Sequence, residues 1–162
     1  IMQDRTIRGM KRLPINEQRA YYAMSVELLS AMPASDCAAV VSMNISAMEN
    51  QRLELQALSK MPDPFVRNQL ALARQALLAE IEDRGIALPL TPSEREIAQS
   101  AFTDRLLMAL ENHHAAAEIF AAAEETPAAT DYGRCALSIE SLKAALAVEG
   151  IAGEWAVRLL SE

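Results

Sequence analysis

The sequence predicts an all-α fold: a single irregular bundle of five to six helices that are mostly antiparallel. Ala and Leu supply 30 and 20 of the 162 residues, whereas Gly supplies 5 and aromatic residues make up 4%. This composition favours helices. No alternating run of strand-forming residues is bounded by turn signals, so no strand is expected. Short connections between the helices favour antiparallel neighbours.

Residues 1–14 are expected to form a basic N-terminal arm that precedes the helical domain of residues 15–162. Pro14 ends this arm, because proline interrupts a helix. A solvated leader is the simplest interpretation of such a charge cluster, and contact with anionic lipid or an acidic partner is the alternative. Its basic residues are Arg5, Arg8, Lys11 and Arg12.

Two helices are expected in the first third of the chain. The first starts after its N-cap, Asn16, and is closed by Pro33. The second is capped by Ser35 and runs from residue 36 to about residue 60. Its apolar pattern thins after Met48, so we expect its last turns to stand clear of the core.

A regular apolar stripe marks the next helix, which starts near Asp63 and is capped at its end by Gly85. The apolar residues step by four, three, four and four, as in a helix that buries one side. We expect these residues to lie in the core: Val66, Leu70, Ala73, Leu77 and Ile81.

The clearest helix start lies at Thr91, where Pro92 suits the first helical position and Glu94 completes a capping box. No further proline and no glycine interrupts the helical pattern before residue 126. Residues 91–125 therefore predict one helix about 50 Å long, the element around which the rest of the chain is expected to be organised. Its core stripe is predicted to be Phe102, Leu106, Leu110, Ala117 and Phe120.

Two further helices are expected near the C-terminal end. One runs from about residue 130 to residue 149, with Gly133 as a weak point near its start, because glycine disfavours a helix. A short last helix follows Gly153, and we expect it to pack across the bundle.

The two cysteines, Cys37 and Cys135, each lie in the first turns of a predicted helix. They can meet at one end of the bundle if these helices run parallel in space. In a secreted or periplasmic protein such a pair forms a disulfide, which we predict; two buried free thiols are the alternative. The spacing excludes a CxxC redox motif, and two cysteines cannot form a thiolate zinc finger.

Glu111, His114 and Glu118 are spaced so that they share one face of the predicted helix. Glu-x-x-His is a metal-binding pair in helical di-iron proteins, so a metal-binding helical-bundle protein is the alternative function. A di-metal site needs a second such pair, and the only other histidine, His113, falls on the apolar stripe. We therefore expect a solvated helix face, with no metal and no cofactor.

The polar second half of the 36–60 helix is predicted to be a partner-binding surface. Exposed leucines between charges would place apolar anchors inside a charged rim, which suits a protein interface better than a small-molecule pocket. A merely solvated helix end is the alternative. The predicted contact residues are Glu49, Arg52, Leu53, Glu54, Leu55 and Gln56.

The sequence contains no Gly-rich phosphate loop, GxSxG, HExxH or EF-hand motif. A net charge of −7 argues against a nucleic-acid binder, and the longest uncharged run, residues 37–48, is too short to span a membrane. We expect a non-enzymatic domain that binds a protein partner, either as a bacterial immunity or inhibitor protein or as an adaptor in an envelope complex. The cysteine pair favours a periplasmic or other extracytoplasmic location, with the cytoplasm as the alternative.

Overall fold

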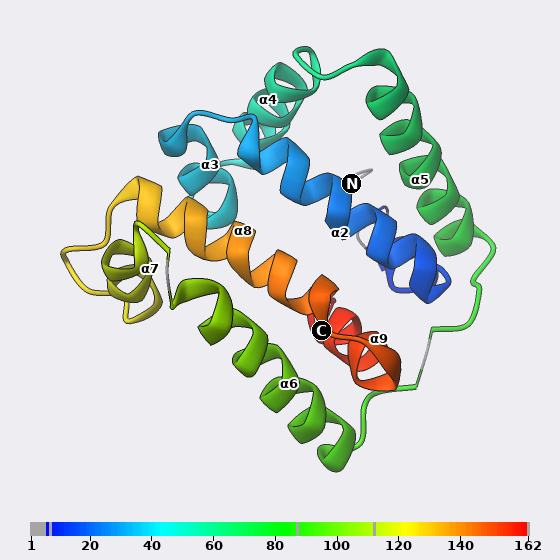
Figure 1. Cartoon of the computed structure of the whole chain (residues 1–162). Helices are drawn as coiled ribbons and strands as arrows, with labels where there is room; N and C mark the ends of the chain where they lie inside the picture. The colour runs from blue at the N-terminus through cyan, green and yellow to red at the C-terminus, as the bar shows by residue number, and fades with distance from the viewer. Residues whose placement is uncertain (1–5, 7, 87, 112, 162) are drawn as a thin grey trace.

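The computed structural model describes residues 6, 8–86, 88–111 and 113–161 of the chain (Figure 1). All regular structure in these residues is helical, and the helices pack together, so the predicted all-α bundle is confirmed. Helices are slightly more numerous than predicted, because two of the predicted helices are each divided by a turn. In chain order they are α2 Ile15–Ser30, α3 Ala34–Val41, α4 Ala47–Leu58, α5 Asp63–Ile81, α6 Pro92–Leu110, α7 Ala116–Ala123, α8 Asp131–Ala147 and α9 Gly150–Leu159.

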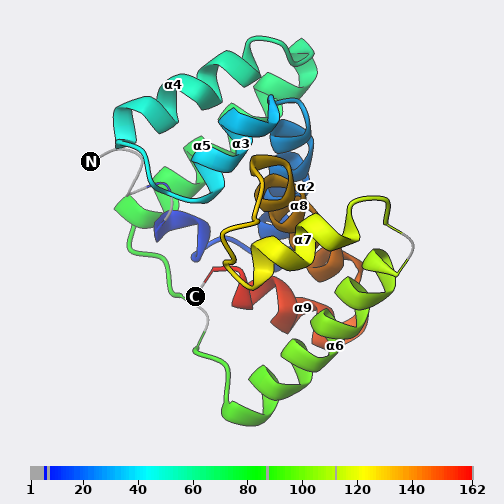
Figure 2. The same ribbon diagram turned by 90° about the vertical axis from the view of Figure 1, so that its left-hand side faces the viewer.

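The central helix is α8, which packs against α2, α3, α6, α7 and α9. In Figure 1 it lies between α2 and α6, and both run antiparallel to it. In the view of Figure 2, α7 lies beside α8. The expectation that residues 91–125 are the centre of the fold is therefore wrong. Small residues let α8 be approached closely from several sides; its buried positions are Gly133, Cys135, Ala136, Ala144 and Ala145.

The helix predicted for residues 36–60 is divided into α3 and α4. Between them Met43 has a φ of 52°, in the left-handed region that a right-handed helix cannot continue through. Ser46 then starts α4, because its side chain accepts a hydrogen bond from the N–H of Glu49 at 3.2 Å. Serine is a favoured N-cap, so the sequence did carry a signal for this second start, and the prediction of one long helix overlooked it.

Several predicted helix ends are also shifted. Neither Asn16 nor Ser35 is an N-cap, because both lie inside a helix: α2 begins at Ile15 and α3 at Ala34, each directly after a proline. Proline fixes φ and lacks an N–H, so its backbone nitrogen needs no hydrogen-bond acceptor at this position. At the other end of α5, Asp83 adopts a φ of 49° and stops the helix before Gly85 is reached.

The predicted capping box at the start of α6 is confirmed. Thr91 Oγ1 accepts a hydrogen bond from the N–H of Glu94 at 3.3 Å, and the N–H of Thr91 donates to Glu94 Oε2 at 2.8 Å. The continuation of this helix to residue 125 is wrong. After α6 ends, the N–H of Ala115 donates to Nδ1 of His113 at 3.2 Å, so a side chain takes the place of a backbone carbonyl and the helix is interrupted.

The interruption brings α7 back across α8 and splits the predicted apolar stripe. Leu110 and Ile119 are buried together against α8, and Leu106 packs beside them. Ala117 and Phe120 instead face outwards, with Phe120 45% exposed. The helical spacing that joined these residues holds only while the helix is continuous.

The N-terminal segment packs on α5 and is not a solvated arm over the residues described. Met10 and Leu13 are 6% and 5% exposed and form a small core with two buried alanines of α5. Arg5, one of the four residues of the predicted basic cluster, lies outside the described residues.

Ion pairs hold the same segment in place. Arg8 Nε and Arg12 Nε each donate a hydrogen bond to the carboxylate of Glu80, at 2.7 and 2.9 Å. Arg12 Nη1 also lies 3.0 Å from Oδ1 of Asp83. The hydrogen bond from Arg8, followed by that from Arg12, lowers the pKa of Glu80 below its ordinary value. Two of the basic residues therefore form ion pairs with other residues of the same chain.

Candidate interaction surface

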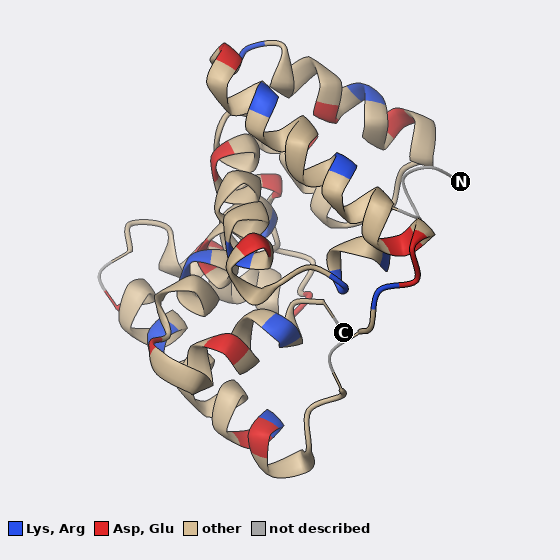
Figure 3. Cartoon of the chain, turned by 90° about the vertical axis from the view of Figure 1, so that its right-hand side faces the viewer, with Lys and Arg blue, Asp and Glu red and all other residues tan. Residues whose placement is uncertain are grey.

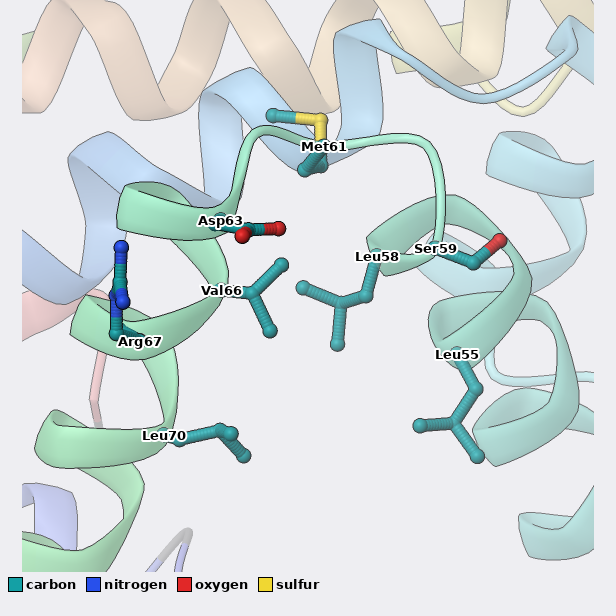
Figure 4. A pocket seen from close by; sticks show the side chains of 8 residues that line it. All are labelled: Leu55, Leu58, Ser59, Met61, Asp63, Val66, Arg67 and Leu70. Atoms are coloured by element: carbon teal, nitrogen blue, oxygen red, sulfur yellow. The ribbon is translucent and has the colours of Figure 1, made fainter.

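An apolar groove separates α4 from α5. In Figure 4, Leu58 of α4 and Val66 of α5 point toward each other across it, and Met61 lies in the turn that joins the two helices. The hollow has a volume of about 470 Å³. Leu55 and Leu70 line it from opposite helices and are 57% and 62% exposed. A contiguous apolar hollow that remains open to solvent is typical of a binding surface.

Polar groups complete the lining of the groove. Ser59, Asp63 and Arg67 contribute one hydroxyl and one charge of each sign. Figure 3 shows acidic and basic residues interspersed along α4 and α5, so neither helix carries a field of a single sign. The surface thus combines apolar contacts with a mixed charged rim, as protein interfaces do.

The groove stays open because α4 and α5 bury their inner faces elsewhere. α4 packs against α2 and α3, with Leu53 and Ala57 only 5% and 3% exposed. α5 packs against α2 and the N-terminal segment, with Ala76 and Ala79 fully buried. The sides of α4 and α5 that face each other beyond the connecting turn are therefore left uncovered by the described part of the chain.

The α5 wall of the groove was predicted to be core, and this was wrong for part of the stripe. Leu70 and Ile81 are 62% and 60% exposed, while Val66 is half-buried on the groove. An apolar stripe indicates that burial of one side of a helix is energetically favourable. It does not indicate whether the same chain or a partner covers that side, so sequence reasoning missed Val66 and Leu70 as candidate site residues.

The predicted contact residues of α4 do not share one environment. Leu53 is buried in the core, which contradicts the expectation that this part of the helix stands clear. Leu55 lies on the groove. Arg52 is on the outer face, where it donates to Glu49 at 2.9 and 2.7 Å and to Gln56 at 3.1 Å.

Glu54, the remaining predicted contact residue, is half-buried and accepts a hydrogen bond from Asn50 Nδ2 at 2.8 Å. Burial raises the pKa of its carboxyl, and the hydrogen bond from Asn50 only partly opposes this. The hydrogen bond from Arg52 has the opposite effect on Glu49, whose pKa is lowered. The two glutamates of α4 therefore affect stability in opposite directions.

We expect Glu54→Gln to raise the free energy of unfolding at pH 7 and to have little effect below about pH 4, where the unfolded carboxyl is also protonated. Between the ordinary and the raised pKa the folded state binds more protons, so this group destabilises the fold increasingly as the pH rises through that window. Glutamine keeps an acceptor for Asn50. Urea unfolding at several pH values measures the effect.

Glu49→Gln is the matched control for this prediction. Its lowered pKa means that Glu49 stabilises the fold above its ordinary pKa and that this contribution is lost as the pH falls. The control should therefore lower the unfolding free energy at pH 7. Two variants that shift stability in the same direction at pH 7 would contradict the assignment.

Cys37 and Cys135 are brought together at disulfide distance. Their sulfur atoms are 2.03 Å apart, their Cα atoms are 5.4 Å apart, and the pair links α3 to α8 in the largest buried cluster. Both residues are buried, with exposures of 0% and 7%. The two predicted helix starts therefore do meet in space, as the predicted bond requires.

Glu111, His114 and Glu118 do not share a helix face, because α6 ends before them and α7 begins between them. His114 Nε2 lies 2.8 Å from the hydroxyl of Tyr132, and Glu118 accepts a hydrogen bond from Thr130. Within the described parts of the chain, no group of three or more His, Cys, Asp or Glu side chains is placed to hold a metal ion. The continuous helix on which the alternative metal site depended is absent.

Among the described residues, no helix has the length and apolar character needed to cross a membrane. Comparison of the chain with protein-family models, with curated proteins and with solved structures found no match.

Proposed function

We propose that this chain is a non-enzymatic interaction domain that binds an apolar segment of a partner protein in the groove between α4 and α5. The observation that supports this most directly is the exposure of Leu55 and Leu70 on the two sides of one hollow. Single exposed leucines are ordinary on protein surfaces, but a contiguous apolar hollow with charges at its edge is typical of an interaction site.

An amphipathic helix is the partner segment that best suits this groove. Two helices form its walls, and a third helix can insert apolar side chains spaced by three or four residues between them. Its polar side would then meet Asp63 and Arg67, which offer one charge of each sign. Burial of Leu55 and Leu70 would supply most of the binding free energy, because apolar anchors dominate such interfaces.

An inhibitor of the immunity type and an adaptor within an envelope complex both require such a surface, and both belong to the proposed class. We further propose that the protein acts outside the cytoplasm. Its cysteine pair at disulfide distance supports this, because disulfides form and persist mainly in oxidising compartments.

Selection of helical peptides from a displayed library against the wild-type protein tests the groove. We expect selected peptides to carry apolar residues three or four positions apart. The double variant Leu55→Asp/Leu70→Asp should bind them about 100-fold more weakly or worse, since loss of two buried leucines costs about 3 kcal/mol or more. Both changes are at exposed positions, so circular dichroism should show an unchanged fold.

Two further variants serve as matched controls. Leu107→Asp/Met108→Asp alters a second apolar hollow, of about 690 Å³, beside α6 and α7. Arg52→Glu alters the outer face of α4. Both should bind the selected peptides as the wild type does. If either control abolishes binding while the groove variant retains it, the proposed site is wrong.

A further inference from the structure

A third hollow, chemically different from the two apolar ones, lies between the N-terminal segment, α2, the linker before α6, α6 itself and the end of α9. Its volume is about 340 Å³, within the range of small-molecule pockets. Three cationic side chains line it: Lys11, Arg95 and Arg158. They come from segments that are far apart in sequence, so only the folded chain brings them to one place. Figure 3 views the side of the molecule that carries the linker and the end of α9.

The charge at this hollow is the opposite of the charge of the chain. The protein has 15 Lys and Arg against 22 Asp and Glu, yet its described lining residues include no carboxylate. Glu94 acts electrostatically on Arg158 from the first turn of α6, but its carboxylate is already hydrogen-bonded to Thr91 in the capping box. Lys11 and Arg158 both line the hollow, so an anion bound there would gain favourable charge contacts with both side chains.

The remaining lining of the hollow is apolar or hydrogen-bonding. Ile86 and Pro89 supply apolar surface from the linker. Arg158 donates a hydrogen bond to the carbonyl of Leu88, which orients its guanidinium group. Gln18 is 5% exposed; its Nε2 donates to the carbonyl of Leu13 at 2.9 Å, whereas its Oε1, shielded from solvent, has no hydrogen-bond partner among the described residues.

We propose that this hollow binds a small organic anion, a carboxylate or phosphate ester with a short apolar body. The anionic group would lie between Lys11 and Arg158, because guanidinium and ammonium groups form strong charge-assisted hydrogen bonds with such oxygens. The apolar body would cover Ile86 and Pro89. This site is separate from the α4–α5 groove and does not depend on the function proposed for it.

Titration followed by ¹H–¹⁵N correlation spectra of the intact chain tests the proposal, with benzoate, phenyl phosphate, inorganic phosphate and neutral benzamide as probes. We expect the two organic anions to bind and to shift the signals of residues around the hollow. Benzamide should bind at least about tenfold more weakly, because it lacks the charge. The stronger of the two anions identifies carboxylate or phosphate as the preferred group.

Lys11→Gln and Arg158→Gln should each weaken binding of the preferred anion by about tenfold, the effect of losing one charge-assisted contact. Arg105→Gln, the same change of charge at an exposed position on α6, should leave it unchanged. If Arg158→Gln perturbs the fold because it loses the contact with Leu88, Lys11→Gln still decides the matter. Four outcomes would each overturn the proposal. Benzamide could bind as tightly as the anions, or Arg105→Gln could weaken binding as much as the two lining variants do. The wild type could bind none of the probes, or it could bind inorganic phosphate alone, as an adventitious ion only.

Discussion

Loss of the Cys37–Cys135 link is expected to lower the free energy of unfolding by about 4–5 kcal/mol, a larger effect than we expect from any other substitution in this chain. The two residues are 98 positions apart, so the bond closes a long loop and removes much conformational freedom from the unfolded chain. A domain of ordinary stability has only about 5–15 kcal/mol in total, so this loss would leave it marginal. Peptide mapping without reductant should first identify a linked peptide.

Single and double alanine variants separate the covalent link from simple packing. Cys37→Ala already removes the bond, so the loop-closure contribution is lost in full. Cys37→Ala/Cys135→Ala should therefore be only slightly less stable than the single variant, the difference being the packing of the second side chain. Urea unfolding of the variants and of wild type measures these differences. A reductant that leaves the midpoint of wild type unchanged would show that no disulfide stabilises the fold.

Gly133→Ala is expected to destabilise the protein by about 1–3 kcal/mol, the usual cost of overpacking a core. Gly133 lies in the first turn of α8, where a Cβ atom would be 2.4 Å from the carbonyl oxygen of Glu118 and 2.9 Å from its carbonyl carbon. These are backbone atoms of α7, which cannot move aside as a flexible side chain can. Helix propensity alone predicts the opposite result, because Ala is about 1 kcal/mol more favourable than Gly in a helix.

Gly85→Ala is the matched control, because no atom of the described residues, apart from those of its chain neighbours, lies within 4 Å of the position that its Cβ would take. This change should be neutral or slightly stabilising, by up to about 1 kcal/mol, since it restricts the unfolded chain. Thermal unfolding followed by circular dichroism compares the two variants. A Gly133→Ala protein that melts at or above the wild-type temperature would contradict the close approach of α7 to α8.

Local signals in the sequence predicted most of the helices and one of their caps correctly. The capping box of Thr91 and Glu94 depends on atoms three residues apart, so it forms whatever the rest of the chain does. The same holds for the all-α class, which follows from composition. Where local signals were weak or were missed, as at Ser46 and His113, the chain turns and the predicted long helices are divided.

The candidate site was predicted less well than the fold. Leu55 was correctly expected to be exposed, whereas Leu53, two positions earlier, is buried. Residues two apart lie on different sides of a helix, so one can be core while the other faces a groove. The matching wall on α5, with Leu70, was assigned to the core because its spacing resembles that of a buried stripe.

The sequence by itself determined that the chain forms helices and where α6 begins, because these properties depend on residue type and on neighbours within one helical turn. It also limited any disulfide to one pair, because the chain has only two cysteines. The tertiary structure alone decided that α8 is the centre, that Gly133 admits no side chain, and that the apolar sides of α4 and α5 face an open groove. Burial depends on which segments distant in sequence come to cover a surface. A stripe of apolar residues indicates that burial of one helix side is energetically favourable. Only the folded chain shows where such a side is left exposed.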